Sequence, residues 1–152
     1  MFSAFTKRVF AVAALVIGLS VPSFAEDTQE TASLYSRLGG YDTIAAVVDS
    51  FFERFDADPS LAPFLGGIST DSGNRIRQMF VDFLCARTGG PCVYTGRDMR
   101  TSHGGLKITD AHWQATLGHL KAALDSAKVG TREKQEVLAF LETLKKDIVM
   151  KP

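Results

Sequence analysis

Apolar residues recur at intervals of three and four along most of this chain, and glycine pairs or a proline end the runs. The clearest run covers residues 41–58, and its apolar members share one helix face. They are Ile44, Val47, Val48, Phe51 and Phe55. No run alternates apolar and polar residues as a half-buried strand does. The pattern predicts an all-α domain with four main helices.

Capping and breaking residues predict where the helices begin and end. Thr31 is the expected cap of a short first helix. A second helix ends at Asp58, because the residue before a proline avoids the helical conformation. Asp71 or Ser72 is the expected cap of a third helix, and Thr109 of a fourth. One last helix follows after a short break.

The N-terminus has the layout of a secretory signal peptide. Two basic residues precede an uncharged apolar run over 9–19, and small residues stand three and one before the bond after Ala25. The run is shorter than the roughly 20 residues of a membrane-spanning helix, although a retained anchor is the alternative. We expect cleavage of residues 1–25, no stable membrane span afterwards, and a periplasmic or secreted domain of residues 26–152.

Charge and cysteine content exclude several classes of protein. Seventeen basic and 17 acidic side chains leave no excess positive charge for a nucleic-acid partner. The chain has no CxxC motif for a zinc ribbon and no CxxCH motif for covalent c-type haem. Cys85 and Cys92 either form a disulfide, which an oxidising compartment permits, or remain a buried thiol and a loop thiol. The distance between their Cα atoms decides.

Histidine chemistry is restricted to three residues. His112 and His119 share a helix face, but about 10.5 Å of rise separates them, too far for one ion without a third ligand. We interpret His119 as structural and His112 as a surface or helix-end residue. His103 lies in a long stretch without periodicity, and such stretches are often functional. The residues alone leave His103 as either a ligand or a solvated loop histidine.

Several ordered segments resemble the group I truncated haemoglobins over residues 33–149. The most specific is TGGPCVYTGRDM, whose Met99 stands four residues before His103. LYSRLGGYDTIAAVVDSFFERF at 34–55 and GHLKAAL at 118–124 also match. The resemblance implies a two-on-two helical sandwich around haem b, iron protoporphyrin IX, with His103 as the proximal iron ligand.

The resemblance also implies the other residues of the haem pocket. It places Tyr94 and an arginine near the haem propionates, with Arg77 as first choice and Arg97 or Arg100 as alternatives. Either Phe64 or Leu65 takes the position of the phenylalanine that wedges against the haem. The implied cofactor-binding set is Phe52, Phe64, Ile76, Arg77, Phe80, Phe83, Tyr94, Met99 and His103, with His103 the metal ligand.

The gas-facing side departs from the family pattern. Phe52 stands where many members have tyrosine, and Ile76 and Phe80 stand where they often have glutamine. Gln78 lies about 200° around the helix from both and is expected to face away. A donor to bound oxygen is worth roughly 1.5–3 kcal/mol. We therefore expect weaker oxygen retention than in tyrosine-bearing relatives.

The implied function is binding of diatomic gases, namely oxygen, nitric oxide and carbon monoxide. Nitric oxide detoxification, with an unidentified reductase as partner, or oxygen transport are its candidate roles. One alternative is an exported haem redox protein for electron transfer or weak peroxidase chemistry, although the pocket has no acid–base residue for a peroxidase. The other is a haem-free helical interaction module, which His103 in its family position argues against.

Overall fold

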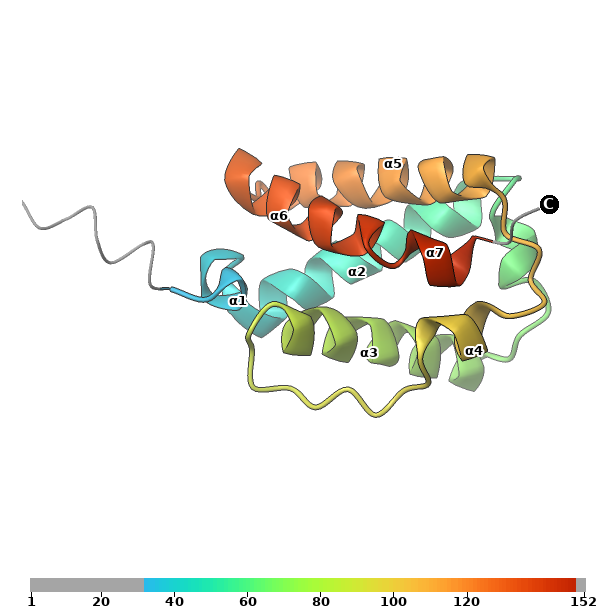
Figure 1. Cartoon of the computed structure of the whole chain (residues 1–152), viewed down its shortest axis with the longest axis horizontal. Coiled ribbons are helices and arrows are strands. Elements are labelled where there is room, and N and C mark those ends of the chain that lie inside the picture. The colour runs from blue at the N-terminus through green and yellow to red at the C-terminus, as the bar shows by residue number, and fades with distance from the viewer. Residues whose placement is uncertain (1–31, 150–152) are drawn as a thin grey trace, which may run out of the picture.

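The computed structural model describes residues 32–149, and every regular element within them is helical (Figure 1). This confirms the predicted all-α class. The predicted signal peptide over 1–25 lies outside the described residues. No helix within 32–149 combines the length and apolar character needed to span a membrane. The elements are α1 (Leu34–Arg37), α2 (Gly40–Ala57), η1 (Ala62–Phe64), α3 (Thr70–Arg87), α4 (Met99–His103), α5 (Asp110–Ser126), α6 (Thr131–Glu142) and α7 (Lys145–Ile148).

The long helices form a two-on-two sandwich. Helix α2 packs against both α3 and α5, and α6 packs along α5, so the α2–α3 pair lies against the α5–α6 pair (Figure 1). The short helix α4 lies beside α7 and is joined to α3 by a long irregular segment. This arrangement confirms the fold that the resemblance implied.

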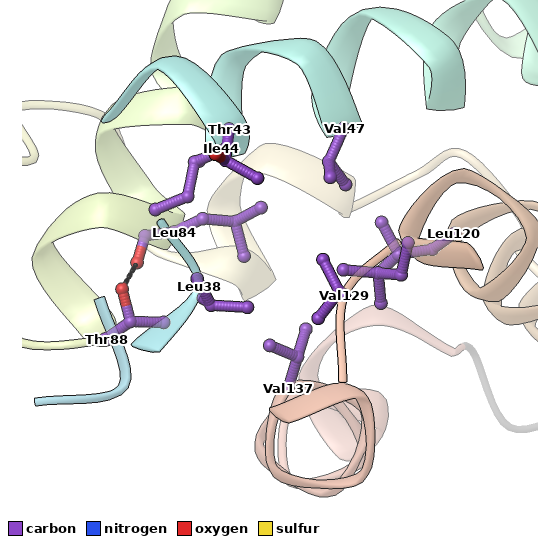
Figure 2. A pocket seen from close by; sticks show the side chains of 10 residues that line it. Leu38, Thr43, Ile44, Val47, Leu84, Thr88, Leu120, Val129 and Val137 are labelled. Carbon is purple, nitrogen blue, oxygen red and sulfur yellow. Dashed lines mark hydrogen bonds between the residues drawn. The ribbon is translucent and has the colours of Figure 1, made fainter. Parts of the chain in front are cut away.

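The predicted apolar stripe of α2 forms the centre of the core. Ile44, Val47, Val48 and Phe51 are all buried, whereas Phe55, nearer the end of the helix, is only partly buried. A void of about 10 Å³ lies where residues of α2, α3, α5 and α6 meet Leu38, which follows α1. Figure 2 shows side chains that line it. The hydroxyl of Thr88, at its edge, donates to the Leu84 carbonyl. Thr43 also lines the void, and its hydroxyl donates to the Gly39 carbonyl, so both hydroxyl protons are used by the backbone and the other lining side chains are aliphatic.

Three helix boundaries differ from prediction. Ser33 caps α1 in place of Thr31, which lies outside the described residues. Ser69 caps α3 in place of Asp71 or Ser72, and its hydroxyl accepts from the Ser72 backbone N–H. Several consecutive polar residues can cap there, so the sequence does not single out one. The last predicted helix is divided into α6 and α7, because two N–H groups bond three residues back in a tighter turn.

Cys85 and Cys92 form a disulfide, with Cα atoms 5.7 Å apart. Two glycines directly after α3 turn the chain back, so that Cys92 can reach Cys85. Gly89 has a φ of +86°, the left-handed conformation that commonly ends helices. At Gly90 a Cβ would lie 2.7 Å from the Cys85 sulfur, so only glycine fits there. The bridge ties the end of α3 to the irregular segment before α4.

Candidate functional site

A cavity of about 950 Å³ lies between the helices and is lined by residues of α2, η1, α3, α4, α5, α6 and α7. Aromatic and aliphatic side chains make up most of its wall, and a few polar groups interrupt it. That composition is typical of cofactor sites. Eight of the nine predicted site residues line the cavity: Phe52, Phe64, Ile76, Phe80, Phe83, Tyr94, Met99 and His103.

His103 is oriented by its own helix. It is the last residue of α4, and its Nδ1 lies 2.9 Å from the carbonyl oxygen of Met99 one turn earlier. A carbonyl only accepts, so Nδ1 carries the proton and the Nε2 lone pair is left free. The half-buried ring lines the cavity. This is the arrangement of a metal-ligating imidazole, and it supplies the hydrogen-bond acceptor that the sequence did not reveal.

Helix α4 has five residues, and Asp98 caps it. One carboxylate oxygen accepts from the Thr101 backbone N–H at 2.9 Å, and the other from the Thr101 hydroxyl at 2.8 Å. These bonds lower the pKa of Asp98, so its carboxylate stays charged at the helix N-terminus, where negative charge is favourable. Arg100 pairs with Asp147 and links α4 to α7. Both interactions hold the turn that carries His103.

The α2–α3 side of the cavity is an aromatic cluster. The ring centroid of Phe80 lies 5.4 Å from that of Phe51 and 6.1 Å from that of Phe52, both edge to face. Such contacts fix the rings without polar atoms. Ile76, 38% exposed, lies at the open edge. The predicted orientation of Gln78 is confirmed, since its amide nitrogen donates to Tyr41 and Asp82, outside the cavity lining.

The structure places Arg77 away from the cavity, contrary to the expectation from the resemblance. Its guanidinium donates to both carboxylate oxygens of Asp49 at 2.6 and 2.8 Å, and this pairing lowers the pKa of Asp49. Arg75 and Arg97 line the cavity instead. Arg75 and Arg77 flank the cavity-facing stripe of α3 at about equal angles. Helical spacing therefore does not distinguish the two arginines, and the ion pair with Asp49 on α2 holds Arg77 away from the cavity.

Tyr94 closes the cavity on the side of the irregular segment. Its hydroxyl donates to the Arg97 carbonyl at 2.7 Å, and its ring packs edge-on against Phe83 with centroids 5.1 Å apart. Burial raises the pKa of Tyr94, so its phenol stays neutral. The segment is thereby held against α3, with Arg97 at the cavity.

Sequence reasoning missed His112 as a cavity residue. Its Nδ1 accepts from the Thr109 backbone N–H in a capping box at the start of α5, which confirms the predicted cap and the helix-end position. Its ring also packs edge-on against Phe64, with centroids 4.9 Å apart, and lines the cavity. The spacing from Thr109 signals the capping box, but nothing in the sequence signals Phe64.

The structural interpretation of His119 is confirmed. Its Nε2 donates to Asp58 at 2.7 Å, outside the cavity lining, and ties α5 to the end of α2. This bond, together with two from Ser60, lowers the pKa of Asp58 to about 2. The tie holds the corner that leads to η1 and Phe64.

The residues of the cavity fit a haem group. Haem requires an apolar slot, a nitrogen ligand for the iron and partners for two propionates. The aromatic cluster provides the slot, His103 presents a free Nε2, and Arg75 and Arg97 lie on the wall as cations. The CxxCH motif needed for c-type attachment is not in the sequence, so the fit is to haem b.

Comparisons with known proteins agree with this fit. The sequence model of a family described as bacterial-like globin matches residues 33–150. The chain is 37% identical to the group 1 truncated hemoglobin GlbN of Mycolicibacterium paratuberculosis, over 78% of this chain and 85% of that protein. It is 32% identical to group 1 truncated hemoglobin LI410 of Chlamydomonas moewusii, over 79% and 70%.

Solved structures show the same similarity. Truncated hemoglobin from Tetrahymena pyriformis in the Fe(III) form superposes with a TM-score of 0.73 at 28% identity, covering 79% of this chain and all of that one. The 2/2 hemoglobin from Synechococcus sp. PCC 7002 gives a TM-score of 0.71 at 26% identity, covering 78% and 98%. The likeness therefore extends over nearly all the described residues.

Proposed function

This chain belongs to the bacterial-like globin family as a group 1 truncated haemoglobin, a haem b protein that binds diatomic gases, and from this premise we propose that it is an exported protein that retains nitric oxide or carbon monoxide in preference to oxygen. His103 holds the iron in this proposal. The observation that carries the gas preference is the apolar wall made by Phe52, Ile76 and Phe80.

The haem iron supplies the position where a gas binds, and the protein decides which gas is held. Oxygen gains negative charge on binding and is retained by a hydrogen-bond donor, worth roughly 1.5–3 kcal/mol. Phe52 and Phe80 provide hydrocarbon edges, and Gln78 is engaged by Tyr41. Carbon monoxide depends less on such a donor. The wall thus lowers oxygen affinity selectively, which favours gas capture over oxygen transport.

Nitric oxide detoxification requires retained oxygen and an electron source. The apolar wall works against the first requirement, and the second needs a reductase of unknown identity. We therefore favour simple capture of nitric oxide over nitric oxide detoxification as the role of this protein. A measured turnover of nitric oxide to nitrate with a supplied reductant would reverse that order.

The disulfide supports the proposal that the protein works outside the cytoplasm. Disulfides persist in oxidising compartments, and Cys85 is fully buried in its bridge to Cys92. The signal-peptide pattern of residues 1–25 points the same way. Tagged protein expressed with these residues, followed by cell fractionation and N-terminal sequencing, tests this part. Uncleaved protein in the cytoplasm would contradict it.

The role of His103 is tested by absorbance with and without dithionite and carbon monoxide. We expect wild type and His119→Gln to bind haem with the same spectrum, since His119 lies outside the cavity lining. His103→Gly should lose the normal spectrum and regain it when free imidazole is added. An unchanged spectrum in His103→Gly would rule out the assigned ligand.

Gas preference is tested by replacing Phe52. Phe52→Tyr should slow oxygen dissociation about ten- to hundredfold, the effect of roughly 1.5–3 kcal/mol, while carbon monoxide dissociation changes much less. Phe52→Leu is the control that changes shape without adding a donor. Slow oxygen release from wild type, unchanged in Phe52→Tyr in stopped-flow measurements, would refute the argument.

A further inference from the structure

A methionine on α3 is the one potential iron ligand on its side of the cavity. Among the described residues that line the cavity from α2, η1 and α3, the others carry hydrocarbon side chains or, at Arg75, a cation. The thioether of Met79 has a lone pair and ligates haem iron in cytochromes. This wall therefore contains a single group that can bind the metal.

Met79 lies on the same face of α3 as Phe83 and lines the same cavity as the aromatic cluster. It lies about 40° around α3 from Phe83, which is buried and lines the cavity. Met79 is itself half-buried and has three rotatable side-chain bonds, so its sulfur can move without displacing the helix. Met99, the other methionine of the cavity, packs against the hydrophobic core, whereas Met79 is outside that core cluster. Core packing therefore does not account for Met79.

His103 reaches the cavity from a different element. It comes from α4, and residues of α3 and α4 line the same cavity between them. A nitrogen from α4 and a sulfur from α3 are therefore available to one iron from two separate elements. Met99 is part of α4 itself, one turn before His103, so it does not offer a second element.

Two other polar residues of the cavity lining, His112 and Thr116, have hydrogen-bond partners on α5 or at its cap. Nδ1 of His112 accepts from Thr109, and its ring packs against Phe64. The Thr116 hydroxyl donates to the His112 carbonyl at 2.8 Å. A water molecule on the iron would need polar partners, and the Phe52–Phe80 wall has none to offer. A thioether needs no such partner.

We propose that the sulfur of Met79 is the sixth ligand of the haem iron when no gas is bound, an inference that rests on the proposed role of His103 as the proximal ligand. The site then alternates between a His103–Met79 state and a gas-bound state in which the thioether has been displaced. Such ligation raises the reduction potential of a haem. It also gives the protein an electron-accepting resting form.

Competition from the thioether lowers the apparent gas affinity, because gas binds only the fraction of the protein in which the iron is open. The apparent dissociation constant is the intrinsic one divided by the fraction of protein with an open iron. If about nine-tenths of the molecules carry the thioether, Met79→Leu should tighten carbon monoxide binding about tenfold. Gln78→Leu, next to Met79 on α3 but outside the cavity lining, should leave it unchanged, which makes it the control.

Spectra of haem-loaded wild type, Met79→Leu and Gln78→Leu test the proposal directly. Wild type and Gln78→Leu should be low-spin, with the far-red sulfur-to-iron charge-transfer band of ferric His–Met haem. Met79→Leu should be high-spin, lack that band and have a lower reduction potential. In stopped flow, carbon monoxide binding to the ferrous wild type should saturate at the rate of thioether release. Binding to ferrous Met79→Leu should stay linear in carbon monoxide concentration.

Other outcomes separate this inference from the proposed function. A high-spin wild type that still depends on His103 overturns the Met79 assignment alone. So does a low-spin spectrum that survives Met79→Leu, and its loss in His112→Phe would assign the ligand to His112. A chain that takes up no haem, or haem uptake and a spectrum that do not depend on His103, overturns both.

Discussion

Reduction of the Cys85–Cys92 disulfide should lower the melting temperature by about 10 °C. The bridge joins residues seven apart in sequence, and closing so short a loop removes roughly 2.5 kcal/mol of unfolded-state entropy. A domain of about 120 residues unfolds with an entropy near 0.25 kcal/mol/K, and the ratio of the two gives the shift. Cys85 is fully buried, so the thiol formed there stays in its apolar site and adds little change of its own.

The bridge also anchors one end of the segment that carries Tyr94 and Arg97 to the cavity. Its other end is held by Asp98, the cap of α4. Reduction frees the first end only, so Tyr94 is then held by its contact with Phe83 and its bond to Arg97. We therefore expect haem to transfer faster to an acceptor apoprotein from the reduced form than from the oxidised form.

The assay is thermal unfolding with and without a phosphine reductant, with free thiols counted in the same samples. Cys92→Ser should melt near the reduced wild type and should not respond to the reductant. If two thiols are counted and the melting temperature is unchanged, the loop-closure argument is wrong. If it falls but haem transfer does not accelerate, the link from the bridge to the cavity is wrong.

Three further predictions concern single side chains. Asp98→Ala should lower the free energy of unfolding by about 1 kcal/mol, because the helix cap is lost, and should speed haem transfer. Asp98→Asn should retain most of the cap. Unfolding and haem-transfer measurements on both variants test this. The pKa of Asp58 is depressed from 3.8 to about 2, so its bond to His119 stabilises the fold above pH 4, and this contribution is lost as the pH falls toward 2. Acid titration of His119→Gln should show a shallower loss over that range, and an identical profile would contradict the role of the bond. Arg97→Ala should weaken haem binding by at most about fivefold, the effect of an exposed ion pair with a haem propionate. Arg77→Ala should leave haem affinity unchanged, because Arg77 pairs with Asp49. Hemin titration measures both.

Features that depend on neighbours in sequence were predictable. The stripe of α2 and the cap at Thr109 follow from helical spacing and from one side chain reaching the next turn. The outward orientation of Gln78 follows from its angle to Ile76 and Phe80. The position of His103 came from resemblance, and the structure places its ring in the cavity.

Features that depend on partners distant in sequence were not predictable. Arg77 is held by Asp49, 28 residues away, and the ring of Phe64 packs against that of His112 on another helix. The spacing of the two cysteines left both the bridge and the free thiols open, and the position of α3 and its glycine turn decided for the bridge. In each case the residue type allowed more than one partner.

The sequence by itself determined that this chain folds as helices and that Thr109 caps one of them, because hydrogen bonds and apolar spacing within a helix involve residues only three or four apart. The tertiary structure alone decided which side chains share the cavity with His103. In the folded chain Arg77 lies away from the cavity, whereas His112 and Met79 line it. The packing of α2, α3 and α5 sets those distances, and local spacing does not.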